Sequence, residues 1–166
     1  NLLHLENLIK QLLPVKQQIQ NWDAIVFAVF YHDIIYNPVK KDNEEKSAAL
    51  AANRLSLLNC GQPTIESCRN IILATRKHEI NIDGDVNYFT DADLSVLGAD
   101  WDTYKKYADN VRKEYAVFPD IIYKPGRRKV LEHFSFMKRI FKTTYFFDRY
   151  ELQAKNNLKK ELELFS

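Results

Sequence analysis

The sequence predicts an all-α protein. Only four glycines and five prolines occur among its 166 residues, too few for the turns of an all-β fold. The long segments between them carry apolar residues at the three- and four-residue spacing of amphipathic helices. Hydrophobic residues make up 46% of the chain and aromatic residues 13%, which is enough for a substantial core. We therefore expect a single helical domain over residues 1–166.

Prolines and polar turns divide the first half of the chain into helices. The expected helices cover residues 2–13, 21–36 and 43–58. Pro14 ends the first, and Asn37-Pro38 ends the second, because proline disrupts a helix interior. The second helix is very apolar and carries His32-Asp33 near its C-terminal end. Alanines, together with Glu44 and Glu45 in the first turn, favour the third.

The same signals continue to the C-terminus. A fourth helix should begin at Pro63-Thr64 and run through Ala74, followed by a polar loop or short turn over residues 78–87. Residues 89–97 form a short apolar segment, for which strand is the weaker interpretation. Further helices are expected over residues 99–117, 127–142 and 146–164, with the main late loop at 118–126. In total the pattern predicts about seven helices.

Charge and cysteine content exclude several classes of partner. The 24 basic and 22 acidic residues are interspersed, and the net charge of +2 indicates no strong field for nucleic acid or a membrane surface. No apolar run approaches the roughly 20 residues of a membrane span, and no signal-peptide pattern is found. Cys60 and Cys68 match neither a zinc-ribbon spacing nor a disulfide framework. We expect reduced thiols in a cytoplasmic protein, and the oligomeric state stays open.

The pair His32-Asp33 is the most informative chemical feature. It can offer an imidazole nitrogen and a carboxylate oxygen to one metal ion, and a charged Asp33 on so apolar a helix is costly unless it is compensated. Alternatively, Asp33 accepts a hydrogen bond from an Arg or Tyr, and His32 merely packs. His4 on the first helix and Asp91-Ala92-Asp93 in the apolar segment add further nitrogen and oxygen donors. Such a mixed set suits Mn, Fe, Zn, Co, Ni or Mg.

The order His, His-Asp, Asp resembles the HD superfamily of metal-dependent phosphohydrolases. Three longer stretches resemble an uncharacterised bacterial subgroup of this family: residues 31–38, 42–48 and 91–98. The resemblance covers most of the chain and implies an antiparallel helical bundle that hydrolyses a phosphate ester. It implies one divalent metal ion with four ligands: His4, His32, Asp33 and Asp93. Asp93 is preferred to Asp91 because the aspartate after the alanine is the ligand in the family motif, and Asp91 would then orient a ligand or water.

The N-terminus carries part of a further motif. In this subgroup and in cyclic-nucleotide phosphodiesterases, the first ligand histidine closes the motif Tyr-His-Asn-x-x-His. Residues 1–4, Asn-Leu-Leu-His, match its last four positions. The resemblance implies a Tyr-His pair immediately before Asn1, whose histidine donates a proton to the leaving group. We therefore expect that the chain as given lacks natural N-terminal residues.

Other polar residues are candidates for catalysis or substrate binding. The catalytic candidates are Glu44, Asp91 and His78, and the substrate-binding candidates are Arg76, Lys77 and Arg127. Glu44 could hold or deprotonate a metal-bound water, since related HD enzymes place an acidic residue just beyond the HD helix. The basic cluster ending in His78 could grip a phosphate, and Arg127 follows an aromatic and basic loop. Helix starts and surface solvation are the alternatives for these residues.

The sequence thus predicts a phosphohydrolase that uses a metal-activated water. Its substrate is expected to be a nucleotide or another phosphorylated small molecule, with no nucleic-acid or membrane partner. The main alternative is a metal-containing, non-catalytic sensor that binds a nucleotide or a partner protein. A metal-free helical scaffold is disfavoured by the linked motifs. An HD-family oxygenase usually needs a second metal and more histidines.

Overall fold

The computed structural model describes residues 2–165, and all regular structure within this range is helical. The elements are α1 (Leu2–Leu12), η1 (Leu13–Gln18), α2 (Trp22–Tyr31), α3 (Asn43–Leu57), α4 (Gln62–Ala74), α5 (Gly84–Leu94), η2 (Ser95–Gly98), α6 (Trp101–Glu114), α7 (Asp120–Phe136) and α8 (Thr144–Glu163), where η denotes a 3-10 helix. The all-α class is confirmed, with eight α-helices in the described range where about seven were expected. None of these helices is long and apolar enough to cross a membrane.

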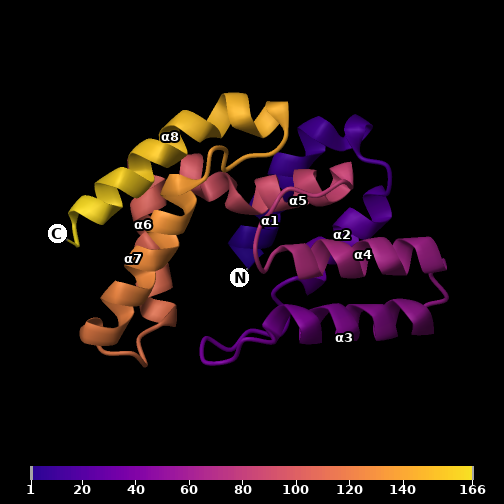
Figure 1. The fold of residues 1–166 in the computed structure, drawn as a ribbon. Coiled ribbons are helices and arrows are strands. Elements are labelled where there is room, and N and C mark those ends of the chain that lie inside the picture. The colour runs from indigo at the N-terminus through magenta and orange to yellow at the C-terminus, as the bar shows by residue number, and fades with distance from the viewer. Residues whose placement is uncertain (1, 166) are drawn as a thin grey trace. The chain divides into compact units, whose positions relative to one another are not determined.

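The chain divides into two compact units, one ending at Asp93 and the other beginning at Leu94. In the first unit, α2 packs against α1, α3 and α4, and α3 and α4 lie side by side (Figure 1). The core side chains of α2 are all aliphatic: Ala24, Ile25, Ala28 and Val29. Burying a side chain of the size of Val or Ile contributes roughly 1.5–3 kcal/mol, so this helix anchors the unit.

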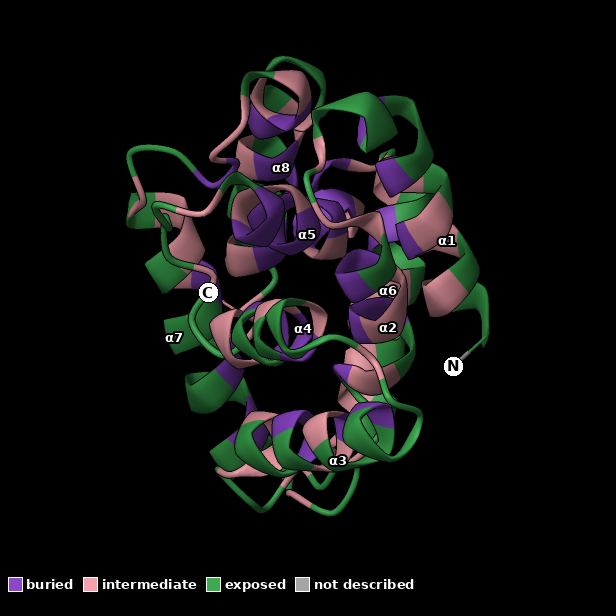
Figure 2. Ribbon diagram, turned by 90° about the vertical axis from the view of Figure 1, so that its right-hand side faces the viewer, coloured by how far each residue is buried: buried purple, intermediate pink, exposed green. Residues whose placement is uncertain are grey.

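Helix α5 is buried over most of its length (Figure 2). Its first turn carries Asp85, whose carboxylate accepts hydrogen bonds from the backbone N–H groups of Gln20 at 2.9 Å and Asn21 at 2.7 Å. These N–H groups lie at the start of α2. The buried carboxylate thereby ties the two helices that carry His32 and Asp93, separated by more than 60 residues of chain, to one another.

In the second unit, α8 packs against both η2 and α7. The side-chain amide of Asn157 donates hydrogen bonds to the carbonyls of Leu97 and Ala99, both at 2.8 Å. Gly98 lies between these two carbonyls, directly against the backbone of α8. The polar amide thus satisfies two backbone carbonyls of the turn that packs against α8.

Several predicted boundaries are wrong. Helix α2 ends at Tyr31 rather than Tyr36, because the following loop instead bonds to α3: Asn37 and Asn43 exchange hydrogen bonds of 3.1 and 2.9 Å. Helix α5 begins at Gly84, so the second part of the expected loop at 78–87 is helical. The apolar segment 89–97 belongs to the helices α5 and η2, so the weaker interpretation of it as a strand is excluded.

The expected loop at 118–126 is also wrong, because α7 begins at Asp120 and continues through Pro125. Proline removes only one hydrogen bond from the ladder, and the buried side chains of Tyr123, Arg127 and Leu131 follow one face of the helix across it. The same helix ends at Phe136 rather than at residue 142. Tertiary packing outweighs the break signalled by proline and glycine.

Candidate metal centre

His4 lies on the buried face of α1. The fully buried side chains of this helix are Leu8 and Leu12, four and eight residues after His4. Residues spaced by four share one face of an α-helix, so the leucines that anchor α1 also turn His4 toward the interior. The imidazole is partly accessible, with 33% of its side-chain surface exposed.

His32 occupies the C-cap of α2 and is almost completely buried, with only 1% of its side chain exposed. Its Nδ1 lies 3.2 Å from the carbonyl oxygen of Ala28 and 3.1 Å from that of Val29. Carbonyl oxygens only accept hydrogen bonds, so Nδ1 carries a proton. In the neutral imidazole the lone pair then belongs to Nε2, and this is the tautomer that can bind a metal through Nε2.

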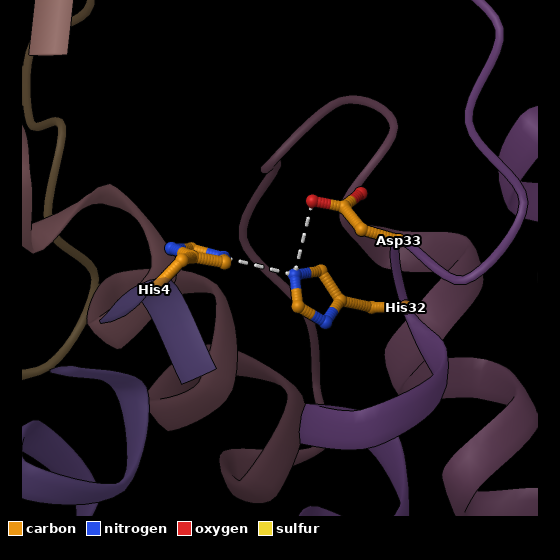
Figure 3. A group of neighbouring side chains, drawn as sticks. All are labelled: His4, His32 and Asp33. Carbon is orange, nitrogen blue, oxygen red and sulfur yellow. Dashed lines mark hydrogen bonds and ion pairs between the residues drawn. The ribbon is translucent and has the colours of Figure 1, made fainter. Parts of the chain in front are cut away.

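The donor atoms of His4 and Asp33 converge around Nε2 of His32 (Figure 3). Nε2 of His4 lies 3.0 Å from it, and Oδ2 of Asp33 lies 3.3 Å from it. Figure 3 shows His4 and Asp33 meeting the same edge of the His32 ring. Ligand atoms on a tetrahedral ion at about 2.1 Å lie roughly 3.4 Å apart, so this spacing fits one metal ion.

Asp93 closes the cluster from α5. Its Oδ1 lies 3.3 Å from Nε2 of His4 and 3.9 Å from Nε2 of His32, whereas its Oδ2 lies 2.9 Å from Nε2 of His78. Burial raises the pKa of this carboxyl, but hydrogen bonds to His4 and His78 and the charge of His32 outweigh it and hold the pKa well below its usual range. Asp93 is therefore ionised, and an anion with only 15% of its side chain exposed favours a bound cation.

The pKa of His32 also indicates a site that favours positive charge. Burial lowers its pKa, but the hydrogen bond with Asp33 and the charges of Asp93 and Asp33 more than offset this and raise the pKa to about 9. The environment of Nε2 therefore stabilises positive charge. The two facing Nε2 atoms of His4 and His32 can share a proton, and a divalent metal ion can take the place of that proton.

The structure brings together five of the residues singled out from the sequence: His4, His32, Asp33, His78 and Asp93. Asp91 is fully buried on α5, but residues two apart on a helix do not share a face, so it points away from the side that carries Asp93. Within residues 2–165, the ion-pair partners of Asp33 and Asp93 are histidines rather than arginines. The start of the N-terminal motif, Asn1, lies outside the described residues.

The remaining candidates occupy other surroundings. Glu44 lies in the first turn of α3, and its neighbour Glu45 forms an ion pair with Arg76. Lys77 follows α4 in a turn, where it is 70% exposed and lies 4.0 Å from Glu79. Arg127 belongs to the second unit, where its buried guanidinium is bound to Glu161. Binding of substrate by these three basic residues stays a prediction.

Two features of the site were not anticipated from the sequence. The carbonyls of Ala28 and Val29 fix the His32 ring, and Phe89 packs edge-on against it with ring centroids 5.6 Å apart. The last carbonyls of a helix can accept a further hydrogen bond from a side chain that follows them, which is a signal for the first feature. The second follows only once residues 84–94 are recognised as a helix that carries Phe89 one turn before Asp93.

Comparisons of the chain with protein-family models, with curated proteins and with solved structures gave no match.

Proposed function

We propose that the first unit binds one divalent metal ion and that the chain is a cytoplasmic metal-dependent phosphohydrolase of the HD superfamily. The observation that carries the proposal is the cluster of His4, His32 and Asp33, whose donor atoms all lie within 4.8 Å of one another. Asp93 on α5 adds a carboxylate oxygen 3.3 Å from His4 and 3.9 Å from His32. The donor atoms are Nε2 of His4, Nε2 of His32, Oδ2 of Asp33 and Oδ1 of Asp93. This set suits Mn, Fe, Zn, Co, Ni or Mg.

A divalent ion, when bound, supplies a Lewis acid that polarises a phosphoryl oxygen and lowers the pKa of a coordinated water. The residues of the chain supply the rest. The backbone carbonyls of Ala28 and Val29 hold His32 in the tautomer that ligates through Nε2. Asp33, with 60% of its side chain exposed, and the partly exposed His4 form the side of the site that faces solvent. A phosphorylated small molecule, such as a nucleotide, is the proposed substrate on this side.

The first test is elemental metal analysis of the purified chain beside Asp33→Ala, both prepared without a chelator. We expect near-stoichiometric Mn, Fe, Zn, Co or Ni in the wild type and its loss in the variant, because Asp33 supplies one of four donors. The matched control is Asp23→Ala, which removes an exposed carboxylate from the opposite end of α2 and should leave the metal content unchanged. A wild type that binds none of these metals and is not stabilised by added Mg would contradict the proposal.

The second test is a phosphoester panel that includes nucleotides, cyclic nucleotides and phosphomonoesters, assayed with the metal-loaded chain. Turnover that disappears in Asp33→Ala but persists in Asp23→Ala would support hydrolysis. A ligand that raises Tm without forming product would instead support the non-catalytic nucleotide sensor, since binding to the folded state alone stabilises it.

A further inference from the structure

His78 follows the last turn of α4 in a backbone conformation that histidine seldom adopts. Its φ is 52°, in the left-handed region, and its N–H donates to the carbonyl of Ala74 at 3.0 Å. Glycine is the usual residue where a helix ends in this conformation, because a Cβ makes the left-handed region unfavourable. The chain therefore places a side chain at a position where the backbone alone favours glycine.

The imidazole of His78 is directed at the candidate metal centre. It is 13% exposed, and its Nε2 lies 2.9 Å from Oδ2 of Asp93. A carboxylate that ligates a metal is deprotonated and can only accept a hydrogen bond, so Nε2 of His78 is the donor in this contact. A charge-assisted hydrogen bond of this length is strong and directional.

This hydrogen bond occupies one oxygen of Asp93 and leaves the other for the metal site. Oδ1 lies 3.3 Å from Nε2 of His4, on the side where the two imidazoles meet. The terminal torsion of an aspartate is broad, so a carboxylate held at only one oxygen can rotate away from a ligating geometry. A donor fixed on Oδ2 removes that freedom.

We propose that His78 is a positioning residue, held in a left-handed backbone conformation so that its imidazole orients the Asp93 carboxylate toward His4 and His32. The inference rests on the proposed metal site and adds a residue that acts on the metal through Asp93. Hydrogen-bond partners of metal ligands commonly change metal affinity by 10–100-fold when they are removed. The position thus trades backbone stability for metal affinity.

The proposed role predicts which substitutions preserve metal affinity. His78→Gly suits the left-handed backbone but removes the donor to Asp93, so its affinity for metal should fall by about 10–100-fold. His78→Gln keeps an N–H donor with a reach close to that of Nε2, and its affinity should stay within about threefold of wild type. The matched backbone control is Asn59→Gly, since Asn59 ends α3 with a φ of 56°.

The experiment titrates the metal-free full chain with Co²⁺, recording the visible spectrum and the Kd, and measures Tm before metal is added. We expect weaker binding and a changed Co²⁺ spectrum in His78→Gly, near-wild-type behaviour in His78→Gln, and no change in affinity in Asn59→Gly. Equal affinity and an unchanged spectrum in His78→Gly would overturn the role of His78 while leaving the metal site intact. A wild type that binds no Co²⁺ would overturn the site itself. A fall in Tm shared by His78→Gly and His78→Gln would assign His78 to packing and also overturn the proposal.

Discussion

The buried ion pair between Arg127 on α7 and Glu161 on α8 allows a quantitative prediction for the second unit. The guanidinium donates to the carboxylate through Nε at 2.8 Å and Nη2 at 2.9 Å, and the hydroxyl of Tyr104 donates to the same carboxylate. Both charged side chains are only 6% exposed. Burial lowers the pKa of Arg127, but its hydrogen bonds to Glu161 outweigh this and raise the pKa, so the guanidinium stays charged.

Arg127→Met should lower the free energy of unfolding by about 3–5 kcal/mol, because it leaves the charge of Glu161 buried without its partner. For a domain of this size, each kcal/mol corresponds to roughly 2–4 °C in Tm, so a fall of about 6–20 °C is expected. The double variant Arg127→Met, Glu161→Leu should recover much of the loss, since neither charge then remains to be desolvated.

Arg128→Met provides the control. This neighbouring arginine is 54% exposed and pairs with Glu132 one turn later, so its loss should cost less than about 0.5 kcal/mol. Urea unfolding followed by circular dichroism measures all three variants. If Arg127→Met unfolded at the wild-type urea concentration and instead weakened the binding of a phosphorylated ligand, Arg127 would be the substrate contact suggested by its sequence context. The burial argument would then be refuted.

Two further predictions concern packing and thiol reactivity. A Cβ at Gly98 would lie 2.5 Å from Cβ of Tyr150, so Gly98→Ala should destabilise the chain by about 1–3 kcal/mol. Gly126 lies in the middle of α7, and a Cβ there would meet nothing within 4 Å. Gly126→Ala should therefore stabilise the chain by about 0.5–1 kcal/mol. Equal urea midpoints for these two variants would contradict the close approach. Burial raises the pKa of the fully buried Cys68 thiol to about 12, so in Cys60→Ala its alkylation should be negligible at pH 8 and rise about tenfold per pH unit until the fold opens. Rapid labelling at pH 8 in native buffer, as fast as in urea, would show that the thiol is accessible.

The helical class follows directly from the sequence, but some boundaries do not. Scarce glycine and proline and the three- to four-residue apolar spacing predict helices without knowledge of their partners. Residues 118–126 were expected to form a loop because Pro125 and Gly126 are of the residue types that commonly break helices. Whether α7 continues through them depends on burial of Tyr123 and Arg127 against other helices, and this information is not local to the segment.

The candidate site was likewise only partly predictable from the sequence. His32 was identifiable because it adjoins Asp33 on a very apolar helix, and His4 because it precedes this pair in the order His, His-Asp, Asp. Residues 89–97 gave no clear helical signal, since α5 is buried on several sides and its apolar residues are not confined to one stripe. The sequence therefore did not show that Asp93 and Asp91 lie on different faces of one helix.

Once α5 is helical, the separation of the two aspartates has a physical basis. Phe89 packs on the His32 ring, and Asp93 lies one turn later on the same face, next to the two imidazoles. The contact of Phe89 with His32 thus places the carboxylate of Asp93, one turn later, beside both imidazoles. The aspartate two residues earlier is directed elsewhere by the same helix. The order of donors in the sequence becomes a set of neighbouring atoms only because α1, α2 and α5 fold so that their donor side chains meet.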